Sequence, residues 1–201
     1  IFNPGNGLLN NEYPAAYELI HQNKEFITEF VIVHLRRINA SLIYSISQDN
    51  NHGVTESAAL YIGALFLEEY TQDRVSIIEL AQWRKKGKRF LVNRLNKLVL
   101  KDGGFAMYSV NYHRSILNLL VMVKVLEARY TKEGIGKILS SQAKKMTIWL
   151  EVLADFDSGD FPNIGTNDGS APFFPQLSIH RSLKDTIDAA NFVFNGTSRF
   201  N

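Results

Sequence analysis

Apolar residues recur along most of the chain at the spacing of about three to four residues that is typical of amphipathic helices. This pattern predicts seven helices, marked by apolar residues within 13–20, 27–42, 58–65, 73–100, 116–123, 139–153 and 183–194. The alternation of apolar and polar residues that is typical of strands is hard to find. The sequence therefore predicts an all-α protein.

Local details follow from the same pattern. Thr55 precedes the third apolar stripe and is the expected N-cap of that helix. His34 occupies an apolar position between residues 27 and 42 and is expected to be a hydrogen-bonded core histidine. The basic run 84–89 (RKKGKR) is expected to be a solvated helix face, with contact to a polyanionic substrate as the less favoured alternative.

The connectors between the predicted helices are rich in Gly, Asn and Asp, and most of them are short. Short connectors favour antiparallel helical hairpins, which build a bundle, a solenoid or an α/α toroid. Periodicity does not choose among these three arrangements. The longest connector covers roughly 155–182, a length that is usually functional or a linker. We expect residues 1–201 to form a single helical domain.

Composition narrows the function classes only a little. The 201 residues include no cysteine, which excludes disulfides, thiolate metal sites and cysteine nucleophiles. A formal net charge of +2 nominates no nucleic-acid partner. The most apolar run, 116–126, contains Asn118 and Lys124 and is too short to span a membrane. The chain begins without Met or a basic leader, so we expect a processed or truncated start.

Polar side chains concentrate in three connectors. Residues 49–57 (DNNHGVTES) precede a predicted helix, where free backbone N–H groups favour anions, although an elaborate N-cap would use the same residues. Residues 102–114 (DGGFAMYSVNYHR) hold a Tyr-His pair that can supply an acid and a base. Adjacent helix residues point about 100° apart, so Tyr112 and His113 need not share a face, and both are also plausible packing residues. Residues 161–170 (FPNIGTNDGS) match a plain turn as well as a site.

Several familiar site motifs are missing from the sequence. The five histidines show no HxxxH or HExxH spacing, and no Gly-rich phosphate loop or GxSxG elbow occurs. The sequence therefore predicts neither a metal site nor a cofactor.

The three connectors together carry a family resemblance. Residues 50–57 resemble the NNHxxTE segment of heparinase II/III-like polysaccharide lyases. Residues 102–114 resemble their DG(S/G)F…YSxNYHR segment, and residues 162–169 (PNIGTNDG) are similar to their PNIGxNDG loop. The segments occur in the family's order, in a form typical of members associated with bacterial surface-polysaccharide loci. A cell-envelope or periplasmic location is implied by this resemblance alone.

The resemblance implies an α/α toroid followed by a β-sandwich domain, of which this chain would hold only toroid helices. It implies β-elimination at a uronic acid of an acidic polysaccharide. The implied catalytic residues are Asn51, which binds the substrate carboxylate, His52, a candidate base or second carboxylate contact, and Tyr112, the acid that protonates the leaving oxygen and an alternative base. The residues expected to bind substrate or support the cleft are Asn50, Glu56, Tyr108, His113, Arg114, Asn167 and Asp168.

Two other functions remain open at this point. A glycoside hydrolase on an α/α scaffold needs two carboxylates across a cleft, and Glu56 with Asp102 or Asp168 would be the available groups. A helical polysaccharide-binding or assembly module needs no catalytic groups. The sequence does not name the polysaccharide, the direction of cleavage or the oligomeric state.

Overall fold

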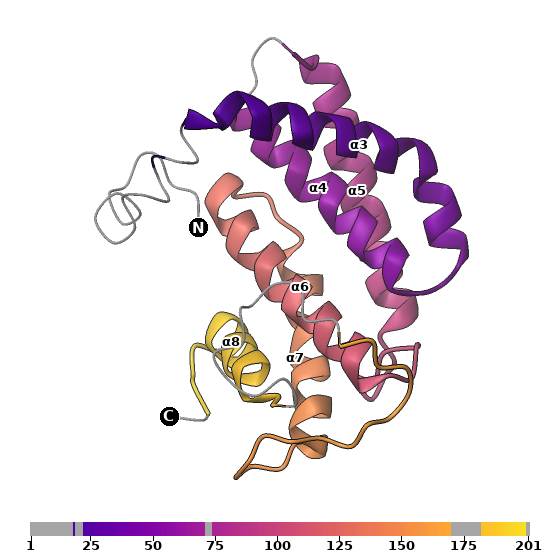
Figure 1. Ribbon diagram of the computed structural model, residues 1–201, viewed down its shortest axis with the longest axis vertical. Helices are drawn as coiled ribbons and strands as arrows, with labels where there is room; N and C mark the ends of the chain where they lie inside the picture. The colour runs from indigo at the N-terminus through magenta and orange to yellow at the C-terminus, as the bar shows by residue number, and fades with distance from the viewer. Residues whose placement is uncertain (1–17, 19–21, 71–73, 170–181, 200–201) are drawn as a thin grey trace.

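A computed structural model describes residues 18, 22–70, 74–169 and 182–199. With the labels of Figure 1, its helices are α3 Lys24–Ser47, α4 Asn51–Tyr70, α5 Ile77–Leu98, α6 Val110–Tyr130, α7 Gly136–Leu153 and α8 Lys184–Asn195. The described residues contain no strand, only an isolated bridge between Val99 and Phe105. The all-α prediction is therefore confirmed, while the helix predicted over 13–20 lies outside the described residues.

The predicted start of the third helix is wrong. Helix α4 begins at Asn51, so Thr55 lies inside the helix instead of capping it. The physical reason is that the Asn50 side chain accepts the backbone N–H of His52 at 2.9 Å, which satisfies a donor of the first turn. The fourth helix begins at Ile77, because Ser76 caps it by accepting the N–H of Glu79.

Helix α4 lies at the centre of the molecule, between two groups of helices (Figure 1). One of its faces packs with α3 and α5 through Leu60, Ala64 and Leu67. The opposite face joins a larger core shared with α5, α6, α7 and α8. Because α4 buries apolar side chains in both directions, its sequence shows little of the one-sided pattern that marks a surface helix.

Gly87 sets the closest approach between α4 and α5. A Cβ atom at this position would lie 2.5 Å from the backbone nitrogen of Tyr61 and 2.8 Å from the carbonyl oxygen of Ser57. Both atoms belong to the α4 backbone, which cannot move aside as a flexible side chain would. The glycine in the middle of the basic run is therefore a packing residue.

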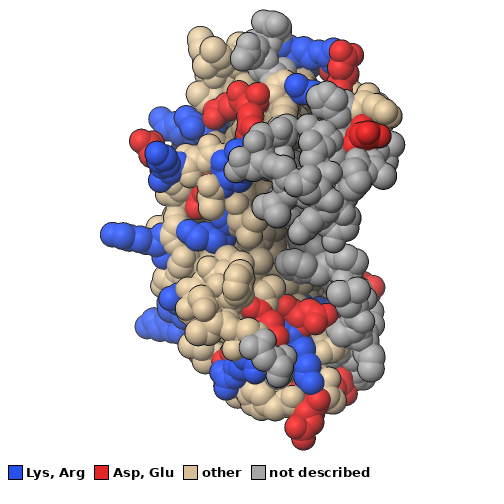
Figure 2. Space-filling view, turned by 90° about the vertical axis from the view of Figure 1, so that its left-hand side faces the viewer, with Lys and Arg blue, Asp and Glu red and all other residues tan. Residues whose placement is uncertain are grey.

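Side chains on either side of Gly87 remain at the surface. Lys85 and Arg89 are exposed, and Arg84 pairs with Glu68 at 3.3 Å. Figure 2 shows acidic and basic side chains interspersed over the face that it presents. The basic run is thus largely a solvated helix face, as the sequence predicted.

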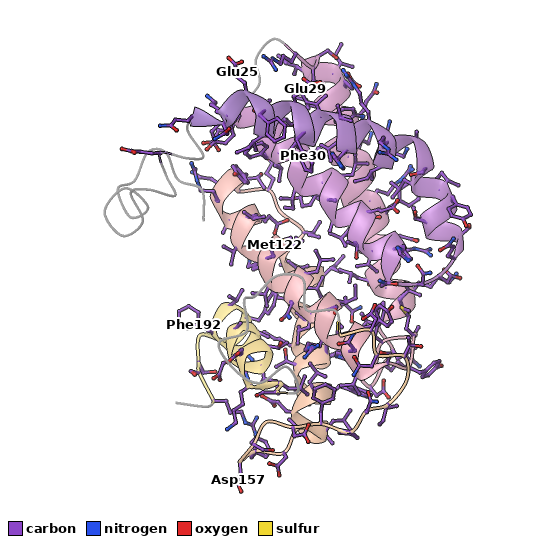
Figure 3. The ribbon with its side chains drawn as sticks, viewed as in Figure 1. Glu25, Glu29, Phe30, Met122, Asp157 and Phe192 are labelled. Carbon is purple, nitrogen blue, oxygen red and sulfur yellow. The ribbon has the colours of Figure 1, made fainter. Side chains whose placement is uncertain are left out.

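The prediction of a buried His34 is wrong, because α3 is an outer helix. His34 is exposed, and its ring nitrogen Nδ1 lies 2.7 Å from the carbonyl oxygen of Phe30 in the preceding turn. Phe30 is itself 53% exposed (Figure 3). At the start of the same helix, Glu25 and Glu29 pair with Arg74. No helix in the described part of the chain is long and apolar enough to cross a membrane.

We expect Gly87→Ala to destabilise the protein, although alanine is the better helix former. The added methyl group would overlap the α4 backbone, and overpacking of this kind costs roughly 1–3 kcal/mol. The free energy of unfolding in urea measures the loss. Gly136→Ala is the matched control, since only the tip of Lys124 lies near its Cβ position, and it should be neutral or stabilising. Equal stability of the two variants would contradict the close packing of α4 and α5.

Candidate functional site

The segment 102–109 folds against α7 before it enters α6. Gly103 adopts a left-handed conformation with φ 96°, and a Cβ there would lie 2.2 Å from the carbonyl oxygen of Lys145. Glycine is therefore required both for the turn and for the close approach to α7. Ser109 then caps α6 by accepting the backbone N–H of Tyr112 at 3.2 Å. This places Tyr112 in the first turn of a helix whose start is fixed.

The connector 161–169 packs on the start of α6. The carbonyl oxygen of Ile164 accepts the N–H of Val110 at 3.1 Å, and that of Thr166 accepts the Ser109 hydroxyl at 2.6 Å. Between them, Gly165 has φ 76°, and a Cβ there would lie 2.2 Å from the carbonyl oxygen of Tyr108. Two segments separated by more than a helical hairpin in sequence therefore form one surface.

Asp168 joins this connector to Tyr112. One carboxylate oxygen accepts the Tyr112 hydroxyl at 3.0 Å, and the other accepts the side-chain N–H of Asn111 at 2.9 Å. Asn111 in turn accepts a hydrogen bond from the Arg114 guanidinium at 2.6 Å. Arg114 is buried, with its guanidinium 5.7 Å from the centre of the Phe161 ring. The Asn111 amide thus connects the buried Arg114 guanidinium to the exposed Asp168 carboxylate, which in turn accepts the Tyr112 hydroxyl.

The Tyr112 hydroxyl lies at an accessible edge of the structure, and its hydrogen bond to Asp168 is exposed. That hydrogen bond is the first cause that raises the pKa of Tyr112, followed by burial and by the negative charge of Asp168. A raised pKa favours the protonated phenol, which is the form that can donate a proton.

His113 points away from this site, into the core. It is 1% exposed, its ring stacks on Trp149 at 4.6 Å, and its Nε2 donates to the carbonyl oxygen of Met146 at 3.0 Å. Burial lowers the pKa of His113 to about 4. A neutral, buried ring of this kind supports packing, so His113 and Tyr112 do not form an acid-base pair.

The NNH segment forms the first turn of α4 and approaches the same region. The backbone N–H of Asn51 donates to the Met107 sulfur at 3.2 Å. His52 is exposed, and Asn51 and Glu56 are half-buried, with one Glu56 carboxylate oxygen shielded from solvent. In the described part of the chain, the Met107 contact joins the two segments, whereas no hydrogen bond links the side chain of Asn51 or His52 to Tyr112.

The backbone is strained two residues before each of these helices. Asp49 precedes the α4 turn with φ 50°, and Tyr108 precedes Ser109 with φ 53°. Asp49 is held by Arg94 and Lys97, and the hydrogen bond from Lys97 is the first cause that lowers the pKa of its carboxyl group. Left-handed conformations of residues other than glycine cluster at functional sites, because the surrounding structure must hold them.

The remaining predicted residues mainly shape the backbone. Asn50 caps α4, and Asn167 donates to the Asn163 side chain at 2.8 Å while accepting the N–H of Gly169 at 3.0 Å. Tyr108 is 73% exposed at the rim. In the described part of the chain, no group of three or more His, Asp or Glu side chains is placed to hold a metal ion.

Several residues of this site were not predicted individually. Asn111, Met107 and Trp149 supply contacts that depend on segments distant in sequence. Ser109 could have been found, because a serine directly before an apolar helix is a common N-cap signal. Nothing in the local sequence around Asn111 shows that its amide bridges Arg114 and Asp168.

Residues 8–169 match the family model described as heparinase II/III N-terminus. The chain belongs to this family. The match contains all three polar connectors and the helices between them, so the sequence resemblance is confirmed. No curated protein and no solved structure matches the chain. Membership of the heparinase II/III family therefore rests on the family model and on the segments that meet at the start of α6.

We expect Gly165→Ala to destabilise the protein more than Gly196→Ala. Both glycines are left-handed, with φ 76° and 71°, so alanine costs about 1–2 kcal/mol of backbone strain at either position. Only at Gly165 would the methyl group also meet the Tyr108 carbonyl, which should add about 1 kcal/mol or more. Urea unfolding of both variants measures the difference. Equal losses would mean that the connector does not pack closely on α6.

We expect His113 to make the protein less stable in acid. Its pKa is lowered to about 4 in the folded state from 6.5, so the unfolded state binds a proton first as the pH falls. The contribution of the neutral His113 ring to the free energy of unfolding is fully present above about pH 6.5. It is lost as the pH falls toward about 4, by roughly 2–3 kcal/mol.

Unfolding in urea at about pH 7 and about pH 4.5 tests this expectation. His113→Gln should show a smaller loss of stability between the two conditions than the unsubstituted chain. His34→Gln, which changes an exposed histidine, should show the same loss as the unsubstituted chain. An unchanged loss in His113→Gln would contradict the role of the buried ring.

Proposed function

We propose that this chain carries part of the catalytic site of a polysaccharide lyase that cleaves uronate-containing polysaccharide by β-elimination. Support comes from its membership of the heparinase II/III family. The observation that carries the proposal is the meeting of three family-like segments at the start of α6, where the Tyr112 hydroxyl is accessible and hydrogen-bonded to Asp168.

The reaction makes two demands on the site. A base must remove the proton next to the uronate carboxylate, and an acid must protonate the oxygen that leaves as the carbon–oxygen bond breaks. The electron pair of the broken C–H bond becomes the new carbon–carbon double bond of the product. Negative charge builds on the carboxylate before the leaving oxygen departs, so a neutral hydrogen-bond donor to that carboxylate lowers the barrier.

The proposed roles follow from these demands. Tyr112 is the acid, because its accessible hydroxyl carries a proton and lies at the start of α6, beside the connector 161–169. Asn51 is the neutral donor to the substrate carboxylate, and the exposed His52 beside it is the candidate base. Tyr108 and Glu56 belong to the proposed substrate-binding rim. Asn50, Asn167, His113 and Arg114 act through the backbone and side chains that they hold in place.

The proposed site draws on a second domain. Family resemblance favours an α/α toroid that works with a β-sandwich domain of the same protein, and that domain would complete the cleft. Among the described residues, the hydrogen bond from Asn51 to Met107 joins the start of α4 to the segment before α6, which is consistent with a cleft that gains further residues from elsewhere.

The hydrolase alternative has less support. Two free carboxylates would have to face each other across a cleft. The Asp168 oxygens accept hydrogen bonds from Tyr112 and Asn111, and Asp102 accepts the backbone N–H of Gly104 at 2.9 Å. A binding or assembly module stays an alternative, which the following experiment separates from a lyase.

The test incubates protein that contains this chain and its β-sandwich domain with a panel of uronate polysaccharides. A lyase forms an unsaturated uronate, which absorbs ultraviolet light. We expect absorbance to rise on at least one substrate, and Tyr112→Phe and Asn51→Ala to lower kcat/KM by about a hundredfold or more. Both variants should keep the free energy of unfolding of the unsubstituted protein within about 1–2 kcal/mol, because both side chains are half-buried and lie outside the apolar core.

Tyr44→Phe is the matched control, since Tyr44 is 70% exposed on α3, and it should keep full activity. If new reducing ends form without a rise in ultraviolet absorbance, the protein is a hydrolase and the lyase proposal is wrong. Saccharide binding without either product would replace it with a binding module.

A further inference from the structure

Asp168 was predicted from the sequence to bind substrate, but its contacts fit another role. Both of its carboxylate oxygens accept hydrogen bonds from α6, one from Tyr112 and one from Asn111. A carboxylate beside an acidic polysaccharide would also repel the substrate rather than bind it. The contacts and the charge therefore argue against direct binding of a uronate by Asp168.

The position of Asp168 is fixed by hydrogen bonds of the connector residues next to it. Ile164 and Thr166 hydrogen-bond to the first residues of α6, and Asn167 closes the turn that leads to Asp168 by accepting the N–H of Gly169. These backbone contacts leave the carboxylate directed at the first turn of α6. A side chain held in this way is suited to orient its partner, because it loses little further conformational freedom when the reaction occurs.

We propose that Asp168 is a positioning residue, which anchors the Tyr112 phenol by accepting its hydroxyl proton in a hydrogen bond and so keeps the phenol protonated until that proton turns from Asp168 to the leaving oxygen. This inference rests on the proposed lyase function. Asn111 and the buried Arg114 support the Asp168 carboxylate on the side away from Tyr112 in the hydrogen-bond chain. Arg114 donates to Asn111, and Asn111 donates to Asp168, so each hydrogen bond polarises the next.

The charged groups around Tyr112 come from three elements. The connector supplies Asp168, and α6 supplies Arg114 through Asn111. The start of α4 carries His52 and Glu56, neither of which is joined to Tyr112 by a hydrogen bond within the described residues. Asp168 is the group whose hydrogen bond and negative charge both raise the pKa of Tyr112. Removal of that charge should therefore lower the pKa of the phenol.

The test begins with a titration that does not depend on activity. Tyrosinate absorbance is recorded against pH for the full chain and for its Tyr112→Phe variant, because the difference isolates one of the 8 tyrosines. The same pair is compared in an Asp168→Asn background. We expect Tyr112 to titrate at a lower pH once Asp168 is replaced by asparagine. Asp168→Glu, which keeps the charge, should restore titration at higher pH.

Asp157→Asn is the matched control, because it makes the same chemical change at an exposed residue between α7 and the connector 161–169, away from α6 (Figure 3). It should leave the titration of Tyr112 unchanged. Titration of Tyr112 at the same pH with and without the Asp168 carboxylate would overturn the proposal, whether or not the protein proves to be a lyase.

Kinetics then separate positioning from binding. Asp168→Asn should lower kcat about tenfold to a hundredfold with little change in KM, and should move the alkaline limb of the pH profile to lower pH. A raised KM with unchanged kcat would assign Asp168 to substrate binding and overturn the proposal. Lack of lyase activity in the unsubstituted protein, with the titration as expected, would refute the proposed function while the link between Asp168 and Tyr112 stands.

Discussion

The packing of the connector 161–169 on the start of α6 is the constraint on which the rest of the site depends. The backbone carbonyl of Ile164 accepts the N–H of Val110, and that of Thr166 accepts the hydroxyl of Ser109. Gly165 permits this close approach because it lacks a Cβ atom. A helix start has backbone N–H groups without partners inside the helix, so a neighbouring loop can dock on it with its backbone carbonyl groups. Asp168 reaches Tyr112 as a consequence of that docking.

Helix α6 separates two chemical environments by its geometry. Tyr112 faces an accessible edge, whereas His113, one residue later, is buried against Trp149 and bonded to Met146. Adjacent helix positions differ by about 100°, so one helix turn carries both a candidate acid and a core residue. The neutral His113 ring adds no charge to the core, while the buried Arg114 guanidinium donates a hydrogen bond to Asn111.

Helix α4 carries part of the site at its start and packs into both apolar cores. Its two apolar faces fix its position between α3, α5 and α6, and the α5 backbone touches it at Gly87. Because α4 cannot shift without disturbing two cores, Asn51 at its start is held in place relative to Met107. The family-like segments of this heparinase II/III family member thus lie at the starts of α4 and α6 and on the connector 161–169.

Sequence alone determined the all-α class, because helical periodicity records which side chains each helix buries. It also determined the three polar segments and the family, because their residues are contiguous. It misplaced His34 and the start of α4, since neither the exposure of α3 nor the capping by Asn50 follows from an apolar stripe. Only the tertiary structure decided that Asp168 meets Tyr112 and that His113 turns inward, because both depend on contacts between segments that local sequence does not relate.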